Sequence, residues 1–231
     1  MTRKMNTDGV VRVGNGRGFI VEHRVYFDFR DGNGYRKIGR NLVVTASHCL
    51  PHLPVMPGSL QETTYPNLLA PLGEEPSVWA KCLFIDPVSD LAIVGEPDNQ
   101  VFGEESDAYV RLVDWRSPFA IAAPESGKGY MLALDGATWE PTALTVHVTI
   151  AGHGLSSGPT LGGQSGSPIL DTKGRAVALV SMGSETTRNG VRTQMEQNGP
   201  QPILKLALPP WLLRATKEHS RKVAEPAAVR G

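Results

Sequence analysis

Short apolar runs, separated by glycine, proline and other turn residues, follow one another along most of the chain. The runs are rich in β-branched residues, which are favoured in strands, and 25 glycines and 18 prolines punctuate the sequence. This pattern is typical of an all-β barrel or sandwich. It predicts strands at residues 18–22, 24–29, 41–46, 78–85, 90–94, 144–150, 168–170 and 176–182.

The segments between and after these runs add a hairpin, a loop and a helix. Residues 31–39, DGNGYRKIG, predict a hairpin turn between the second and third strands, because Asp-Gly and Asn-Gly tolerate the positive φ of tight turns. Residues 50–77 carry neither a strand nor a helix period and are rich in proline, so we expect a long surface loop beside a binding site. Helix is scarce elsewhere, but Pro209 and Pro210 suit a helix start and predict a C-terminal helix over 209–224.

Length and charge narrow the classes of protein. With 231 residues, 40% of them apolar, the chain is long enough for one large or two small domains with a buried core. Lys plus Arg and Asp plus Glu both total 23, so no net charge attracts nucleic acid or an anionic membrane. The start lacks the apolar core of a secretory signal, and no run of about 18 apolar residues occurs, which predicts a cytoplasmic protein.

Cysteine and histidine usage gives no sign of a disulfide scaffold or a metal site. Cys49 and Cys82 are the only cysteines, which fits a reducing compartment, although a bridge between these two stays open as an alternative. We interpret His147 as an ordinary strand residue. No metal-ligand spacing relates the histidines outside the TASHC motif to each other or to cysteine, so we expect no metal and no cofactor; they are His23, His52, His147, His153 and His219.

Three separated motifs carry the residue types of nucleophilic catalysis. A serine hydroxyl becomes a good nucleophile when a base removes its proton, and the base works best when a carboxylate fixes its tautomer. The sequence offers His48 in TASHC, Asp90 in SDLAIV and Ser165 in GGQSGSP, each beside an apolar run that a rigid barrel can hold. Asp86 stays an alternative acid, although the proline after it favours a loop role. Ser167 stands where a GxSxG elbow needs glycine, which disfavours an α/β-hydrolase.

These motifs resemble those of the chymotrypsin-like, or trypsin-like, serine proteases, especially bacterial members without a propeptide switch. The resemblance covers about residues 10–215 and rests on motifs in the family's order, namely GRGFIVE, VVTASHC, DLAIV, GGQSGSP and VSMGS. It implies an all-β fold of two six-stranded antiparallel Greek-key barrels with a C-terminal helix. The implied domains are an N-terminal barrel over 8–107 with His48 and Asp90, a C-terminal barrel over 108–215 with Ser165, and a polar tail over 216–231.

The resemblance also assigns roles to residues. It makes Ser165 the nucleophile, His48 the general base and Asp90 the group that orients His48, while the backbone N–H groups of Gly163 and Ser165 form an oxyanion hole. Ser181 then fixes the buried side of the His48–Asp90 pair, and the backbone of 182–184 adds the substrate as an extra strand. The implied substrate-binding residues are Pro159, Thr160, Ser181, Met182, Gly183, Ser184 and Gly190.

Three departures from the family's pattern modify these expectations. Gln164 stands where zymogen-forming members carry an aspartate, so no N-terminal cleavage is needed to form the oxyanion hole. No cysteine precedes Cys49, so the family's usual disulfide at this position is absent. No acid lies at Pro159 and Thr160, the expected base of the specificity pocket, so a preference for Arg or Lys is not supported. The implied pocket walls Met182, Gly183 and Gly190 favour an apolar or small side chain at the cut site, although a charge from Glu185 stays an alternative.

The sequence therefore predicts a serine endopeptidase that works through an acyl-enzyme, most simply a regulatory protease inside the cell. Its partner is a protein or peptide substrate bound as an extended strand, and an activating protein partner stays open. Two other functions remain as alternatives. One is a catalytically silent, protease-like module that binds peptides, and the other is an esterase with the same triad.

Overall fold

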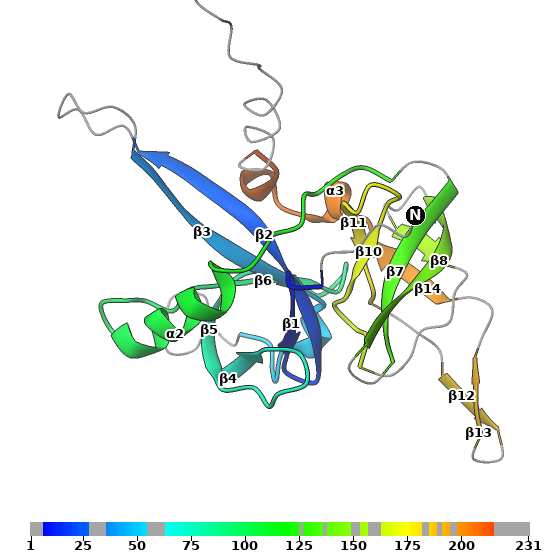
Figure 1. The fold of residues 1–231 in the computed structure, drawn as a ribbon, viewed down its shortest axis with the longest axis horizontal. Coiled ribbons are helices and arrows are strands. Elements are labelled where there is room, and N and C mark those ends of the chain that lie inside the picture. Colours follow the sequence, from blue (N-terminus) through cyan, green and yellow to red (C-terminus); the bar gives the residue numbers. More distant parts are fainter. Residues whose placement is uncertain are drawn as a thin grey trace, which may run out of the picture.

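The structure is a computed structural model, and most of its described residues belong to strands. Figure 1 shows two β-rich units side by side, linked by a helix and an extended segment. The described residues are 7–27, 36–54, 63–124, 127–135, 138–148, 153–156, 163–181, 185–188, 191–194 and 198–214.

The first unit is a closed barrel of six antiparallel strands in the order β1-β2-β3-β6-β5-β4. Strand β3 pairs with β6 and not with β4, which follows it in sequence, as expected for a Greek-key connection. Buried apolar side chains from every strand fill the interior, with β5 contributing Ala80 and Cys82, so the apolar runs predicted as strands form part of the core of this barrel. Its strands are β1 (Val10–Val13), β2 (Gly16–Phe27), β3 (Arg36–Thr45), β4 (Thr64–Ala70), β5 (Val78–Asp86) and β6 (Leu91–Gly95).

The second unit is a six-stranded antiparallel sheet in the order β11-β10-β7-β8-β9-β14. An isolated antiparallel bridge between Ala178 and Ile203 brings its two edges toward each other, but closure into the predicted second barrel is not among the strand pairings of the described residues. A separate ribbon of β12 (Glu185–Arg188) and β13 (Val191–Gln194) extends away from this sheet (Figure 1). The sheet comprises β7 (Gly127–Asp135), β8 (Thr138–Val148), β9 (His153–Ser156), β10 (Pro168–Leu170), β11 (Ala176–Leu179) and β14 (Asn198–Pro202).

The predicted hairpin is confirmed in its strands. Strand β2 runs without interruption from Gly16 to Phe27, so the two runs predicted at 18–22 and 24–29 are one strand. It pairs with β3 in a register that joins Phe27 to Arg36, and the turn residues themselves lie outside the described residues. The strand that contains His147, β8, agrees with the interpretation of that residue.

The prediction of a long loop over residues 50–77 is wrong, because strand β4 lies within it. Pro66 and Asn67 are exposed in the middle of this strand, and Asn67 has φ 51°. The pairing of β4 with β5 shifts register between Tyr65 and Leu69, so a bulge interrupts the alternation by which a strand is recognised.

Helices are few, as predicted, but two of them were not foreseen. Helix α2 (Gly103–Val113) buries Ser106, Tyr109 and Leu112 on one face, and the Tyr109 hydroxyl donates to the Asn41 carbonyl oxygen at 2.9 Å. Helix α3 (Leu204–Ala207) follows β14. Residues 210–214 are helical, which agrees with the predicted start of the C-terminal helix, and its remainder lies outside the described residues. The domain boundaries after residues 107 and 215 stay predictions.

Candidate active site

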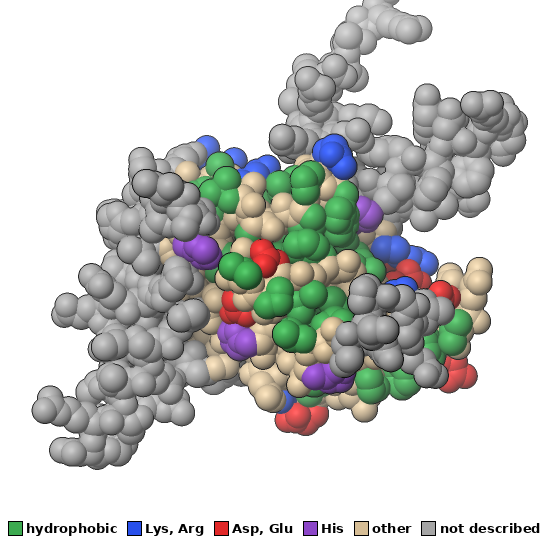
Figure 2. Space-filling model, turned by 180° about the vertical axis from the view of Figure 1, so that it is seen from behind, with side chains coloured by type: hydrophobic (Ala, Val, Ile, Leu, Met, Phe, Trp, Pro, Cys, Tyr) green, Lys and Arg blue, Asp and Glu red, His purple; other side chains and the backbone are tan. Residues whose placement is uncertain are grey.

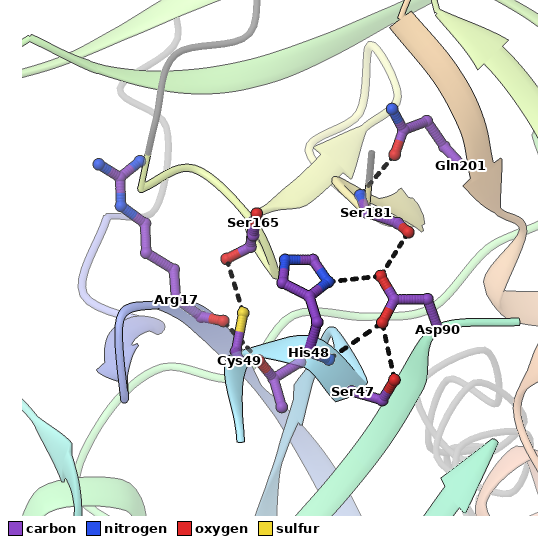
Figure 3. Close-up of polar contacts among 9 residues, drawn as sticks. Arg17, Ser47, His48, Cys49, Asp90, Ser165, Ser181 and Gln201 are labelled. Carbon is purple, nitrogen blue, oxygen red and sulfur yellow. Dashed lines mark hydrogen bonds and ion pairs between the residues drawn. The ribbon is translucent and has the colours of Figure 1, made fainter. Parts of the chain in front are cut away.

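The pairing of β3 with β6 brings His48 and Asp90 together. Thr45, at the end of β3, pairs with Ala92 in β6, so the residues just after β3 face those just before β6. His48 lies in the short 3-10 helix η1 (Ser47–Cys49) that follows β3, and Asp90 precedes β6. His48 Nδ1 lies 2.7 Å from Asp90 Oδ2, a hydrogen bond that Figure 3 shows.

Asp90 is surrounded by hydrogen-bond donors. Its Oδ1 accepts the Ser47 hydroxyl at 2.7 Å and the His48 backbone N–H at 3.0 Å, while Oδ2 accepts the Ser181 hydroxyl at 2.5 Å in addition to the His48 ring. Burial acts to raise the pKa of Asp90, but these hydrogen bonds outweigh burial and hold the pKa below its usual value. Asp90 is therefore an ionised carboxylate with both oxygens fixed in place.

The carboxylate in turn makes His48 a stronger base. The hydrogen bond to Asp90 raises the pKa of His48, partly offset by desolvation. The imidazole is 49% exposed, whereas the Asp90 side chain is 18% exposed. His48 thus presents its remaining ring nitrogen to the surface while its other nitrogen is held by the carboxylate.

The loop that carries Ser165 is clamped by backbone hydrogen bonds. The Ser165 carbonyl oxygen accepts the Arg17 N–H at 2.7 Å and the Cys49 thiol at 3.5 Å, so both partners come from the first barrel. The Gly166 N–H donates to the Val180 carbonyl oxygen at 2.6 Å. Gly166 has φ +82°, and a Cβ there would lie 1.8 Å from the Arg17 carbonyl oxygen, so only glycine fits.

Ser165 and His48 line the same cleft, but their side chains are not hydrogen-bonded to each other. In Figure 3 the imidazole lies between Ser165 and Asp90. Among the described residues, no hydrogen bond joins the Ser165 hydroxyl to His48. The cleft has a volume of about 700 Å³ and is lined by Ser47, His48, Leu50, His52, Leu53, Pro87, Asp90, Ser165 and Ser181.

Two backbone donors beside Ser165 have no partner within the described part of the chain. Neither the Gly163 N–H nor the Ser165 N–H donates a hydrogen bond to another described residue. Gly163 is exposed with φ +83°, and no atom lies within 4 Å of the place where a Cβ would stand. Gln164 between them is buried, at 1% exposure. Both N–H groups thus make no hydrogen bond within the described part of the chain.

The remaining predicted site residues divide into two groups. Ser181 lies in the cleft, where it donates its hydroxyl to Asp90 and its backbone N–H to Gln201 Oε1. The other predicted substrate-binding positions lie outside the described residues: Pro159, Thr160, Met182, Gly183, Ser184 and Gly190.

Asp86, the alternative acid, serves a turn. Its Oδ1 accepts the N–H groups of Val88 at 3.0 Å and Ser89 at 3.3 Å, which closes the turn between β5 and β6. A hydrogen bond from the Ser89 hydroxyl lowers the pKa of Asp86, so this carboxylate is ionised and occupied locally. The acid that contacts His48 is Asp90.

Both cysteines are free and buried, so the open alternative of a Cys49–Cys82 disulfide is wrong. Burial raises the pKa of Cys49 to about 11, which leaves its thiol protonated at neutral pH. A Cβ added at Gly16 would lie 2.4 Å from the Cys49 sulfur. Gly16, the first residue of β2, therefore leaves room for the Cys49 side chain between the first barrel and the Ser165 loop.

The described residues form no metal-binding cluster, and the face seen in Figure 2 carries no large field of one charge. No cluster of three or more His, Cys, Asp or Glu side chains within the described ranges could hold a metal ion. On the face seen in Figure 2, apolar side chains mix with histidines and acids, and lysine and arginine lie mainly toward its edges. None of the helices in the described part of the chain is long and apolar enough to cross a bilayer.

Ser47 is a residue of this site that contacts Asp90 and to which the sequence analysis assigned no role. Its hydroxyl contacts Asp90, yet the serine stands in TASHC only as the neighbour of His48. The contact follows from the pairing of β3 with β6, which the sequence motif by itself does not specify.

No family model matches the sequence, and the search of curated proteins finds no match. Among solved structures, the chain is similar to a human pathogenic astrovirus serine protease, with 16% identity, coverage of 87% of this chain and 91% of that one, and a TM-score of 0.48.

Two further solved structures to which the chain is similar are also proteases. The Rv3671c protease in its inactive form has 15% identity and a TM-score of 0.48, with coverage of 95% of this chain and 91% of that one. The HtrA-type protease AlgW with a decapeptide has 11% identity and a TM-score of 0.47, with coverage of 94% of this chain and 66% of that one.

Proposed function

We propose that the protein is a serine endopeptidase of the chymotrypsin-like class, with Ser165 as nucleophile, His48 as general base and Asp90 as the orienting acid. One observation carries the proposal. The imidazole of His48 is hydrogen-bonded to an ionised carboxylate at 2.7 Å and shares a surface cleft with a serine on a glycine-rich loop. Acyl transfer needs this combination, because the serine needs a base to remove its proton, and the base needs a carboxylate to fix its tautomer and stabilise its protonated form.

The chemical steps follow from these roles. His48 Nε2 takes the proton of the Ser165 hydroxyl as its oxygen attacks the scissile carbonyl carbon, and Asp90 stabilises the imidazolium that forms. The imidazolium then gives its proton to the leaving amine, which leaves an acyl group on Ser165. Water, deprotonated by His48, attacks the ester carbonyl, and the Ser165 oxygen leaves with the proton returned by His48. No cofactor takes part in these steps.

The backbone N–H groups of Gly163 and Ser165, which donate to no other described residue, support an oxyanion hole in this mechanism. A negative charge develops on the carbonyl oxygen of the substrate, and two backbone donors stabilise it without a change in their own position. Gln164 is neutral and buried, so a new N-terminal ammonium has no carboxylate to pair with at this residue. We propose that the hole forms without N-terminal cleavage.

Substrate or an activating partner has one hydrogen bond left to form in this site, that between the Ser165 hydroxyl and His48. Both residues line the cleft, but their hydrogen bond is absent from the described contacts, and catalytic hydrogen bonds commonly tighten only when substrate is bound. We propose that binding of an extended peptide closes this contact. We propose that this peptide pairs as an added strand with the backbone of residues 182–184, which follow β11 (Ala176–Leu179) in the sequence.

Cleavage of a peptide library by the full chain tests the proposed function. The wild-type protein is expected to cut a defined subset of peptides, as read by mass spectrometry, and Ser165→Ala is expected to cut none. Ser89→Ala is a matched control, because this hydroxyl is exchanged in the same way and lies in the turn that Asp86 closes. Its cleavage pattern should equal that of the wild type.

The same experiment separates the alternatives. Turnover of small esters without cleavage of any peptide identifies an esterase. Binding of extended peptides without turnover of either peptides or esters identifies a catalytically silent module. The absence of a hydrogen bond between the Ser165 hydroxyl and His48 among the described contacts would then agree with that outcome. The cleavage profile also tests two further proposals, that the cut site accepts an apolar or small side chain and that the protease is regulatory, which predicts few sites and not many.

A further inference from the structure

Ser47 donates two hydrogen bonds to Asp90, one from its side chain and one from its backbone. Its hydroxyl donates to Asp90 Oδ1 at 2.7 Å, and its backbone N–H donates to the Asp90 carbonyl oxygen at 3.2 Å. The residue is buried, at 4% exposure, and begins the short helix that carries His48. Ser47 therefore holds both the backbone and the side chain of Asp90 from the element that presents the base.

The backbone of Asp90 needs such support. Asp90 has φ +52°, in the left-handed region that costs free energy for residues with a Cβ, although aspartate tolerates it better than most. A residue in this conformation keeps it only when surrounding contacts fix it. The Ser47 N–H supplies one of those contacts at the Asp90 carbonyl oxygen.

The four hydrogen bonds to the carboxylate are divided evenly between its two oxygens. Oδ2 receives the His48 ring and the Ser181 hydroxyl, and Oδ1 receives the Ser47 hydroxyl and the His48 N–H. Rotation of the carboxylate about its terminal torsion, which is intrinsically broad, would move Oδ2 away from the ring. The pair of donors on Oδ1 opposes that rotation.

We propose that Ser47 is a positioning residue, whose hydroxyl locks the Asp90 carboxylate in the orientation that holds the His48 ring. This inference rests on the serine endopeptidase proposed above. The Ser47 hydroxyl is hydrogen-bonded to Asp90 and to neither His48 nor Ser165, so it acts on the proposed chemistry through Asp90. Its removal leaves the three triad residues in the sequence but loosens the geometry that makes them work together.

Ser47→Ala tests this role through the rate at which a fluorophosphonate phosphonylates the full chain, with fluoride as the leaving group. We expect a fall of about tenfold, the scale of a single hydrogen bond to a charged group. Ser106→Ala is the matched control, because Ser106 is equally buried, at 4% exposure, and also donates its hydroxyl to a carboxylate, that of Glu96. The control should react at the wild-type rate.

A double-mutant cycle with Asp90→Asn separates positioning from general damage to the fold. If Ser47 acts through the Asp90 carboxylate, Ser47→Ala should slow phosphonylation by the fluorophosphonate much less in the Asp90→Asn protein than in the wild type. An equal effect in both backgrounds would overturn the proposal. Ser47→Thr, which retains the hydroxyl, should recover most of the rate, and a threonine variant that folds like wild type but reacts like alanine would also contradict it.

A titration of the Asp90 carboxyl by carbon-13 NMR keeps the inference testable apart from catalysis. Ser47→Ala is expected to raise the pKa of Asp90, because one hydrogen bond to its ionised form is lost. If the fluorophosphonate does not modify the wild-type protein at all, the proposed function fails. The titration still decides whether Ser47 holds the Asp90 carboxylate. An unchanged pKa in Ser47→Ala would overturn the inference.

Discussion

The two halves of the candidate site are held in different ways. On the first barrel, His48 and Asp90 are fixed through their functional atoms, since the ring nitrogen and both carboxylate oxygens are hydrogen-bonded. On the loop before β10, Ser165 is fixed through its backbone carbonyl oxygen, and its hydroxyl makes no hydrogen bond to His48 among the described contacts. The half with His48 and Asp90, the proposed acid–base pair, is therefore preorganised, whereas the half with Ser165, the proposed nucleophile, is anchored through its backbone.

This difference shows how the two β units depend on each other. The Ser165 loop is held by Arg17 and Cys49 of the first barrel, and Ser181 of the second unit donates to Asp90 in return. Each half thus supplies a contact that orients the other. Substitutions in the first half should change the chemistry with little loss of fold, whereas substitutions in the anchoring contacts should change both.

The largest effect is expected for the acid of the preorganised half. Asp90→Asn should lower the peptidase rate by about 10⁴-fold, because the amide favours the wrong tautomer of His48. Asp86→Asn is the matched control, since the same exchange four residues earlier affects only a turn. Its rate, measured on the same peptide, should lie within about twofold of the wild type. Similar losses in both variants would remove Asp90 from the mechanism.

Two glycines of the anchored half sharpen the comparison further. Gly163 and Gly166 both have positive φ, of +83° and +82°, but only at Gly166 would a Cβ meet the Arg17 carbonyl oxygen. Gly166→Ala should therefore destabilise the protein by more than about 4 kcal/mol. Gly163→Ala should cost only the backbone strain, about 1–2 kcal/mol. Urea unfolding measures both, and equal losses would mean that the close contact with Arg17 is not formed.

A smaller effect concerns pH, and here activity and stability should move in opposite directions. The pKa of His48 is raised by Asp90, and the base must be neutral to act, so the rate should fall as pH drops through a value above the usual 6.5 or so. A raised folded-state pKa adds stability that is fully present below the unfolded pKa and is lost as pH rises through the folded one. Rates and thermal melts over pH 5–9, with His48→Ala as control for the melts, test both signs. A rate that rises with acid would contradict the role of His48.

Much of the preorganised half could be predicted from the sequence. Apolar runs mark β3 and β6, and the motifs at their ends contain His48 and Asp90, so pairing of these strands brings the two residues together. The roles of Ser47 and Asp86 could not be predicted in this way. They depend on which donors surround each carboxylate, and that depends on strand pairing and turn geometry.

Two of the elements that the sequence analysis missed, β4 and α2, share a physical cause. Strand β4 is interrupted by a bulge at Pro66 and Asn67, and the buried face of α2 includes a polar serine, Ser106, beside Tyr109. In both cases a polar residue interrupts the apolar pattern: the exposed bulge breaks the alternation of β4, and Ser106 takes one of the buried, helically spaced positions of α2. The second barrel was inferred from resemblance, and the pairings of the described residues give a six-stranded sheet.

The most direct test of the central claim is the site of covalent modification by a fluorophosphonate. After reaction at neutral pH, peptide mapping by mass spectrometry is expected to find the adduct on Ser165 alone, with the modification lost in His48→Ala. An adduct on another serine of the cleft, such as Ser47 or Ser181, or no adduct under conditions in which the protein is folded, would contradict the account.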